Sequence, residues 1–484
     1  MKEISLNTKQ KEAVYHFNGP LMILAGAGSG KTRVITHKIA NLINNCNISP
    51  RNIMGVTFTN KAASEMKDRL IEMLGKGNIK GLILSTFHSL CSNILRKHAG
   101  VINYQANFSI YGESDQLSMI KQIILDLGYS KEQIDAYDVA SIIGRAKNQL
   151  LFPEHVSENH SLGWDEAFIK IYKYYQNRLK AHQAMDFDDL ILNTVYLLNN
   201  HKNIKDKLIN QYKYILVDEY QDTNYAQFEL LKLLTHDQSN ITIVGDDDQS
   251  IYSWRGAESS NFLRFEKEYK NVNTIILDQN YRSTNTILKS ANAIIQKNTN
   301  RKPKNLKSNK GTGDLIAYYE CEEEEDEAFT IADIILSKKI REKIRYHNFA
   351  ILYRTNYQSR PFETAFRERN IPYRIIGGIS FYDRKEIKDL VAYLKLINNL
   401  EDDISLLRIV NYPKRGIGET SIESFRKHAL NNKLSLFQAM GETSKIDELD
   451  IKAKARITEF VDLIDSFKKE FETNSLSSCL KRLV

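Results

Sequence analysis

The sequence has little of what marks disulfide-rich, metal-cluster or fibrous proteins. Only four of its 484 residues are cysteines, Cys46, Cys91, Cys321 and Cys479, and none belongs to a CxxC pair. This spacing excludes a disulfide scaffold, a zinc ribbon and an iron–sulfur site of the usual kind. The eleven histidines form no HExxH motif and no cluster with cysteine, so we predict no zinc. Seven prolines and 22 glycines are too few for a low-complexity chain.

Long apolar runs are absent as well. No run approaches the ~18 residues that span a bilayer, and the N-terminus, MKEISLNTKQ, has no apolar signal-peptide segment. We therefore expect a cytoplasmic protein with no membrane partner. At about 150 residues per domain, the length predicts roughly three domains. The 67 basic and 60 acidic residues give a net charge of +7, which permits a nucleic-acid partner without requiring one.

What recurs along the chain is a short apolar run that ends abruptly in polar residues. Unbroken runs of this length are typical of parallel strands buried on both faces. Between them lie helical patterns, such as Ala63, Met66, Leu70 and Met73. This alternation predicts an α/β fold, with parallel sheets flanked by helices. The predicted strands are 21–25, 53–57, 82–86, 214–217, 241–244, 275–277 and 349–353.

Other stretches lack such runs. Residues 109–184 carry helical periods and no strand pattern, which predicts an all-helical insertion. A basic stretch at 301–307 and an acidic run at 322–327 are interpreted as solvated connectors. After Gly377 and Gly378 the pattern is helical to the end of the sequence.

The glycine-rich stretch at 21–32, LMILAGAGSGKT, predicts a phosphate-binding loop between a strand and a helix. Its glycines let backbone N–H groups surround an anion, and the helix N-terminus adds a positive dipole. Lys31 would reach the β- and γ-phosphates, and the Thr32 hydroxyl would bind Mg²⁺. The strict motif begins with glycine, where this chain has alanine. The predicted nucleotide-binding residues here are Ala25, Gly26, Ala27, Gly28, Ser29, Gly30, Lys31, Thr32 and Arg33.

A nucleoside triphosphatase also needs an acidic metal site and a group that activates water. The predicted strand 214–217 ends in Asp218 and Glu219. Asp218 would hold Mg²⁺, and Glu219 would accept a proton from the attacking water. Because ligands bind at the carboxyl ends of parallel strands, we expect this pair to face Lys31.

Three further blocks extend the pattern: DEYQDTN at 218–224, VGDDDQSIYSWRGA at 244–257 and QNYRST at 279–284. Together with AGAGSGKT, their order and spacing resemble the superfamily 1 DNA helicases of the UvrD/PcrA/Rep type over almost the whole chain. The resemblance implies two RecA-like motor domains with ATP between them, each with an all-helical insertion, moving 3′ to 5′. The implied parts are 1–108 with 185–283, insertion 109–184, second motor domain 284–378 and its insertion 379–484.

The resemblance also implies roles around the nucleotide. Gln10 corresponds to the glutamine that recognises the adenine edge, and Tyr281 to the aromatic that stacks on adenine. Gln249 is similar to the γ-phosphate sensor that couples ATP to DNA. Arg282 is similar to an arginine finger that stabilises the transition state.

Single-strand motors hold DNA with aromatic platforms and phosphate contacts. The resemblance places Trp254 as a stacking stop in such a track. It also implies a duplex contact at 411–418, through Lys414, Gly416 and Gly418. The expected partners are single-stranded DNA and single/double-strand junctions, together with repair or replication proteins. The other predicted DNA-binding residues are Phe58, Asn60, His88, Phe187, Tyr252, Arg255, Arg354 and Asn356.

The family pattern continues beyond the features present in this sequence. Two further motifs, one with a second arginine finger, follow the second insertion in the family, whereas this sequence stops at Val484 within the predicted insertion. One hypothesis is therefore a 3′–5′ helicase chain that lacks part of its second motor domain. The alternative is a chain that binds ATP and single-stranded DNA with little motor activity. A helicase–nuclease subunit is disfavoured because no nuclease carboxylate/lysine pattern is present.

Overall fold

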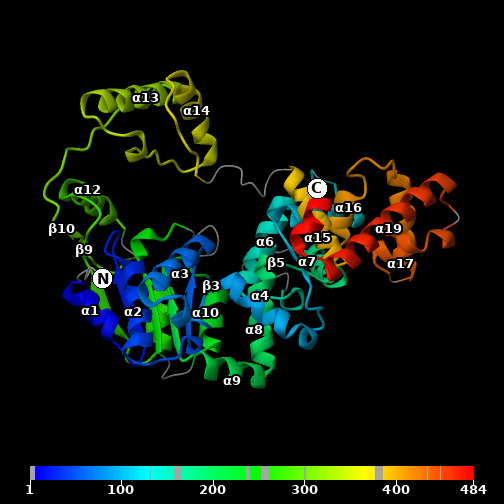
Figure 1. The fold of residues 1–484 in the computed structure, drawn as a ribbon, viewed down its shortest axis with the longest axis horizontal. Helices are drawn as coiled ribbons and strands as arrows, with labels where there is room; N and C mark the ends of the chain where they lie inside the picture. The colour runs from blue at the N-terminus through cyan, green and yellow to red at the C-terminus, as the bar shows by residue number, and fades with distance from the viewer. Residues whose placement is uncertain are drawn as a thin grey trace. The chain divides into compact units, whose positions relative to one another are not determined.

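The computed structural model describes residues 6–130, 132–156, 165–235, 240–251, 261–298, 301–376, 385–432, 434–446 and 448–483. These residues divide between two compact units (Figure 1). The first comprises Met1–Asp314 with Lys395–Cys479, and the second Leu315–Leu394 with Leu480–Val484. This division falls after Asp314, whereas the sequence suggests a boundary at 283/284. The four predicted domain ranges stay a prediction.

A six-stranded parallel sheet forms the centre of the first unit, in the order β3-β2-β6-β7-β1-β8. Its side chains alternate between two cores: Met22 and Leu24 face one, and Leu21, Ile23 and Ala25 face the other. Burial on both faces explains the unbroken apolar runs, and six of the seven predicted strands are confirmed. The strands are β1 Leu21–Ala25, β2 Ile53–Thr57, β3 Ile83–Thr86, β6 Tyr214–Val217, β7 Asn240–Gly245 and β8 Asn273–Leu277.

Helices cover both faces of this sheet. Thr59 caps the N-terminus of α3 by accepting from the Ala62 N–H, and Gly75 follows its last residue. On one face, α1, α2 and α3 contribute to the core, and on the other α4, α8, α10 and α11 do so. Their bounds are α1 Thr8–Tyr15, α2 Lys31–Asn44, α3 Asn60–Leu74, α4 Phe87–Lys97, α8 Phe187–Asn200, α9 Lys202–Gln211, α10 Tyr225–Leu233 and α11 Asn261–Glu268.

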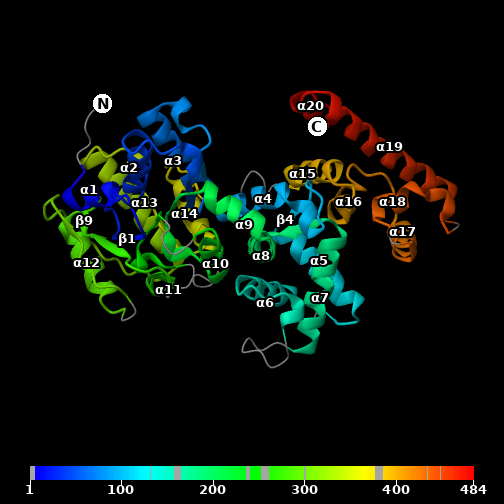
Figure 2. The same ribbon diagram turned by 90° about the horizontal axis from the view of Figure 1, so that it is seen from below.

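The insertion at 109–184 is mainly helical, and Figure 2 shows α5 beside α7. Its ends are not helical, however: β4 (Ser109–Tyr111) and β5 (Ala184–Asp186) pair as parallel strands. The all-helical prediction is wrong at these ends, because the chain enters and leaves the insertion side by side and its extended backbone groups pair. The helices are α5 Glu113–Asp126, α6 Ala136–Asn148 and α7 Glu166–Ala181.

The C-terminal part of the first unit is helical, as predicted, in the portion that the structure describes. It contacts the insertion through polar groups: Asn399 Nδ2 donates to the His182 carbonyl at 3.1 Å, and the Tyr111 hydroxyl donates to Asp402 at 2.7 Å. The helices are α15 Lys385–Asn398, which begins in the second unit, α16 Asp403–Ile409, α17 Glu419–Asn432, α18 Leu436–Gly441, α19 Ile451–Thr473 and α20 Leu476–Leu483, whose second half belongs to the second unit.

The second unit packs α13 (Glu324–Arg341) against α14 (Ser359–Glu368). The predicted strand 349–353 is wrong: these residues form no strand, and Leu352 is 90% exposed. The described part of this unit contains no strand that could pair with them, and an isolated strand leaves its backbone groups without partners. The acidic run 322–327 is not a simple connector either, since four of its residues form the first turn of α13, where the helix dipole favours negative charge.

None of the described helices combines the length and apolar character needed to cross a bilayer.

Candidate nucleotide and DNA site

The phosphate loop joins β1 to α2, as predicted. Gly28 and Gly30 have φ angles of 66° and 91°, which residues other than glycine rarely adopt. A Cβ on Gly26 would lie 2.1 Å from Cδ2 of Leu306, so any other residue there requires Leu306 or the loop to shift. The Ser29 hydroxyl and the Arg33 guanidinium carry buried polar atoms without a hydrogen-bond partner among the described residues. Buried polar groups of this kind normally find a partner, which fits a loop that binds a polyanion.

Asp218 lies directly after β6 and is buried beside the start of α2. Its carboxylate hydrogen-bonds the Thr32 side chain, and its backbone N–H donates to the Val56 carbonyl at 2.9 Å. Burial, reinforced by the neighbouring Glu219, raises the pKa of Asp218 to about 7. A hydroxyl and a carboxylate side by side are the oxygen ligands that Mg²⁺ prefers. The residues present therefore fit the predicted metal site.

Glu219 occupies a left-handed backbone conformation, with φ of 50°, which costs free energy and is typical of functional sites. Lys31 Nζ lies 2.9 Å from its Oε2, and Gln221 Nε2 donates to the same oxygen at 2.9 Å. Burial would raise the pKa of Glu219, but Lys31, Gln221 and Arg282 outweigh it and hold the pKa below its usual value. The group is thus an anion at neutral pH, as a proton acceptor must be.

The residues predicted for adenine recognition also lie at the phosphate loop. Gln10 is 1% exposed, and its amide donates to the Ser29 carbonyl at 2.8 Å. Tyr281 is 44% exposed, and its backbone N–H donates to the Gly28 carbonyl at 2.9 Å. Its hydroxyl accepts a 2.8 Å hydrogen bond from the Asn7 side chain. The structure therefore brings Gln10 and Tyr281 to the same loop.

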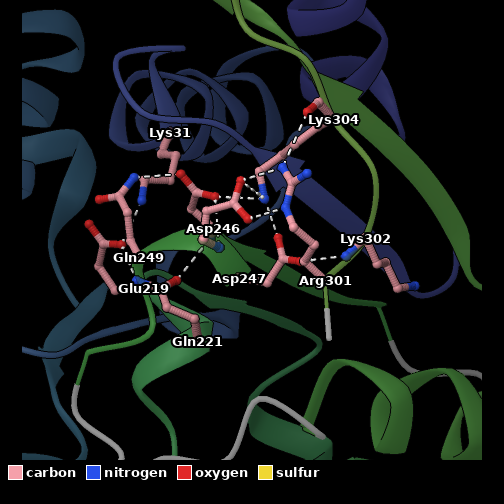
Figure 3. Close-up of polar contacts among 10 residues, drawn as sticks. Lys31, Glu219, Gln221, Asp246, Asp247, Gln249, Arg301, Lys302 and Lys304 are labelled. Carbon is pink, nitrogen blue, oxygen red and sulfur yellow. Dashed lines mark hydrogen bonds and ion pairs between the residues drawn. The ribbon is translucent and has the colours of Figure 1, made fainter. Parts of the chain in front are cut away.

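Gln249 joins this site through side chains that the sequence analysis missed (Figure 3). Its Nε2 donates to Asp246 at 2.5 Å, and the Asp246 N–H donates to the Gln221 side chain at 2.9 Å. Gln221 in turn contacts Glu219, which pairs with Lys31. A continuous polar network thus runs from the phosphate loop to the loop that follows β7.

The basic stretch 301–307 contacts the site through the Arg301 and Lys304 side chains, and its interpretation as a solvated connector is wrong. Lys304 is 2% exposed in its side chain and contacts Asp246, Asp247 and Asp248. The sequence held a signal for this contact, because the three adjacent acids at 246–248 and the basic stretch at 301–307 have complementary charges. The sequence alone does not show that the chain returns after α12 (Asn285–Ile295) to pair β10 (Lys307–Ser308) with β9 (Gln279–Asn280). This pairing brings the basic stretch to the site.

Two of the predicted DNA platforms contact one another. Phe187, the first residue of α8, is 52% exposed, and its ring centroid lies 5.6 Å from that of His88 in an edge-to-face arrangement. Phe58 is half-buried after β2, and Asn60 is exposed at the start of α3. All four follow carboxyl ends of strands or begin the helices there. Tyr252, Trp254 and Arg255 lie outside the described residues.

The remaining DNA candidates lie elsewhere in the chain. Arg354 and Asn356 are exposed and belong to the second unit. The loop at 411–418 belongs to the first unit, where Lys414 and Gly418 are exposed. Arg456 fixes this loop by donating to the Gly416 carbonyl at 2.9 Å.

Residues 6–270 match the UvrD/REP helicase N-terminal domain, and residues 275–470 match the UvrD-like helicase C-terminal domain. The chain belongs to the UvrD/REP helicase family. It is 46% identical to the ATP-dependent DNA helicase PcrA of Staphylococcus aureus (strain Mu50) over 468 residues, 96% of this chain and 64% of that protein. It is 44% identical to PcrA of Staphylococcus epidermidis (strain ATCC 12228) over 480 residues, 99% of this chain and 65% of the relative. The chain therefore spans 64–65% of these relatives.

Proposed function

We propose that this chain is an ATP-dependent DNA helicase and single-strand translocase that moves 3′ to 5′ in the cytoplasm. Its substrates are ATP and single-stranded DNA, including junctions with duplex, and its process is DNA repair or replication with partner proteins of those pathways. Family membership and the two PcrA relatives support the helicase activity. The polarity rests on the resemblance alone.

The observation that carries the proposal is the network from Lys31 through Glu219, Gln221 and Asp246 to Gln249. Hydrolysis needs a phosphate-binding cation, a base and a γ-phosphate sensor in fixed relation, and this network joins all three. Its end at Gln249 lies three residues before the Tyr252–Arg255 stretch assigned to DNA, so the sensor is close in sequence to the proposed DNA track.

In the proposed reaction, the phosphate loop and Lys31 bind the ATP phosphates. Engagement of Lys31 by phosphate would free the Glu219 carboxylate to accept a proton from water attacking the γ-phosphorus. Mg²⁺ held near Thr32 and Asp218 would neutralise phosphate charge. Arg282 would stabilise charge that develops in the transition state. Gln249 would sense the γ-phosphate and couple its presence to the DNA-binding segment.

A paired hydrolysis and unwinding assay tests the proposal. ATP hydrolysis should increase with single-stranded oligonucleotide, and Lys31→Ala should abolish it while leaving the fold intact by circular dichroism. Duplexes with a 3′ or a 5′ single-stranded tail distinguish the polarity, since only the 3′-tailed substrate should unwind. Hydrolysis that persists in Lys31→Ala would refute the assigned site. Preference for the 5′ tail would refute the polarity alone.

The alternative is a chain that binds ATP and single-stranded DNA with little turnover of its own. The observation that favours it is the stretch 349–353 in the second unit, which has a strand-like sequence but forms no strand. Normal ATP and DNA affinity with hydrolysis close to that of Lys31→Ala would support this alternative, whereas DNA-stimulated multiple turnover would exclude it.

A further inference from the structure

Three consecutive acidic side chains after β7 are held by two basic side chains of the segment 301–304 (Figure 3). Lys304 Nζ lies 2.8 Å from Asp246 Oδ1 and 3.0 Å from Asp248 Oδ2, and it also contacts Asp247. Arg301 forms two bonds to Asp248, of 2.6 and 2.8 Å. We call these five residues the acid–base clamp.

The carboxylates of the clamp are close enough together to hold a metal ion, but the chain already supplies their cation. The Lys304 side chain is 2% exposed, and it lies among all three acids. Burial disfavours its charge, yet Asp246 and Asp247 outweigh that effect and raise its pKa, so it remains an ammonium ion. Removing one partner from a buried ion cluster leaves uncompensated charge and is costly. The arrangement is therefore fixed by Lys304 rather than by an added ion.

The segment that carries Lys304 also contacts other parts of the nucleotide site. Leu306 lies against Gly26 of the phosphate loop, and Lys310 Nζ donates to the Arg282 carbonyl at 3.0 Å. Between them, β10 pairs with β9, which leads directly into Tyr281. The segment 301–310, which we call the strap, therefore contacts three loops of the site: the loop after β7, the phosphate loop and the loop that holds Arg282.

Asp246 is where the clamp meets the catalytic network. Its Oδ1 contacts Lys304, its Oδ2 accepts from Gln249 at 2.5 Å, and its backbone N–H donates to Gln221 at 2.9 Å. Gln221 donates to Glu219. Asp246 is 1% exposed with Lys304 in place, so Lys304 and not bulk water neutralises its carboxylate in the folded chain.

We propose that Lys304 is a positioning residue for ATP hydrolysis: it fixes Asp246, and through Asp246 it sets the sensor Gln249 and, by way of Gln221, the base Glu219. This inference rests on the proposed ATP-hydrolysing function and adds a role for a residue outside the phosphate loop and the Asp218–Glu219 pair. A small displacement of a catalytic group costs up to ~10²-fold in rate. The loss should therefore appear in the chemical step and not in nucleotide binding, which the phosphate loop provides.

The test uses the full 484-residue chain with Lys304→Met, Lys304→Arg and the control Lys302→Met. Lys302 is adjacent and pairs with Glu266 on α11, while its contact to Asp247 comes from its backbone N–H and survives substitution. Single-turnover hydrolysis of radiolabelled ATP, with enzyme in excess and saturating single-stranded oligonucleotide, measures the chemical step even when turnover is slow. Titration with a fluorescent ATP analogue measures binding.

The expected result for Lys304→Met is at least a ~10-fold slower single-turnover rate with analogue affinity within about twofold. Lys304→Arg keeps the cation and should recover most of the rate, and Lys302→Met should match the unchanged chain. An unchanged rate in Lys304→Met would overturn the proposal. So would a parallel loss of rate and affinity, or an arginine variant no better than methionine, because either would indicate a merely structural role.

Two further variants keep the outcome interpretable. If Lys304→Met does not fold, Arg301→Gln removes the two bonds to Asp248 but keeps the Lys304 cation, and it should slow hydrolysis by a smaller factor. A folded Arg301→Gln with unchanged rate would then overturn the proposal. Lys31→Ala separates this inference from the function on which it rests: if it does not slow hydrolysis, the ATP site itself is misassigned.

Discussion

The side-chain oxygen of Gln221 accepts a hydrogen bond from the backbone N–H of Asp246 at 2.9 Å. The close approach is possible because Gly245 has no side chain: a Cβ there would lie 2.6 Å from Gln221 Oε1 and 2.8 Å from the Phe262 ring. The glycine between β7 and the acid–base clamp therefore makes room for the group that links Asp246 to Glu219.

Gly245→Ala is expected to displace Gln221 and slow ATP hydrolysis, with a loss of stability of about 1–3 kcal/mol from overpacking. Chemical denaturation and single-turnover hydrolysis measure the two effects. Gly77→Ala is the matched control, because a Cβ on Gly77 would meet nothing within 4 Å. A Gly245→Ala protein as stable and as active as Gly77→Ala would show that Gln221 does not need this space.

The phosphate loop offers a second steric prediction. Gly26→Ala would place Cβ 2.1 Å from Leu306 Cδ2, so either the loop or the strap must move. We expect weaker binding of a fluorescent ATP analogue, and we expect the double variant Gly26→Ala/Leu306→Ala to recover most of it, since the obstacle is one side chain. If Leu306→Ala gave no recovery, the requirement for glycine would come from the bound phosphates and not from the strap.

The sequence predicted most of the first unit because its signals are local. Each apolar run of the six-stranded sheet is buried on both faces, so the run itself specifies the strand. The phosphate loop and the Asp218–Glu219 pair could likewise be placed from strand ends alone. The strand prediction for 349–353 was wrong because it also used only local signals. A strand needs a partner strand, which its own residues do not specify.

The missed part of the site depends on contacts between distant segments. Lys304 meets Asp246 across 58 positions of sequence, and its neighbourhood of lysine, asparagine and proline is equally typical of a solvated loop. Burial of its side chain follows from the β9–β10 pairing, which involves only two residues of each strand and leaves no periodic pattern. Gln221 was missed because neighbouring Asp218 and Glu219 already accounted for the expected chemistry.

Phe187 is expected to bind single-stranded DNA by stacking. The residue is about half exposed, and its ring makes an edge-to-face contact with His88. Phe187→Ala should weaken oligonucleotide affinity by ~1–3 kcal/mol, as loss of one base–aromatic stack does. Fluorescence anisotropy with a labelled oligothymidylate measures this. Tyr196→Ala is the control, because Tyr196 lies on the same helix with 47% exposure; an equal loss in both variants would argue against specific stacking at Phe187.

Lys38 predicts a pH dependence of stability that is separate from catalysis. It lies on α2 and is 3% exposed, and its ammonium donates to the carbonyls of Ala13, at 3.1 Å, and His16, at the end of the helix that carries Gln10. Burial lowers the pKa of Lys38 from 10.5 to about 8. The unfolded chain therefore holds this proton more tightly than the folded one. Between pH 8 and 10.5 the contribution of Lys38 to stability should rise with pH, and below pH 8 it should be constant.

The measurement is the difference in unfolding free energy between the unchanged chain and Lys38→Met as a function of pH. It should shift in favour of the lysine by up to about 3 kcal/mol between pH 8 and 10.5, because each pKa unit is worth about 1.4 kcal/mol. Using the difference cancels the titration of tyrosines and cysteines that both proteins share. Lys11→Met, an exposed position on α1, controls for the loss of one lysine charge. A difference that stayed flat across this window would mean that Lys38 keeps its proton in the fold, with the hydrogen bonds at the end of α1 outweighing its burial.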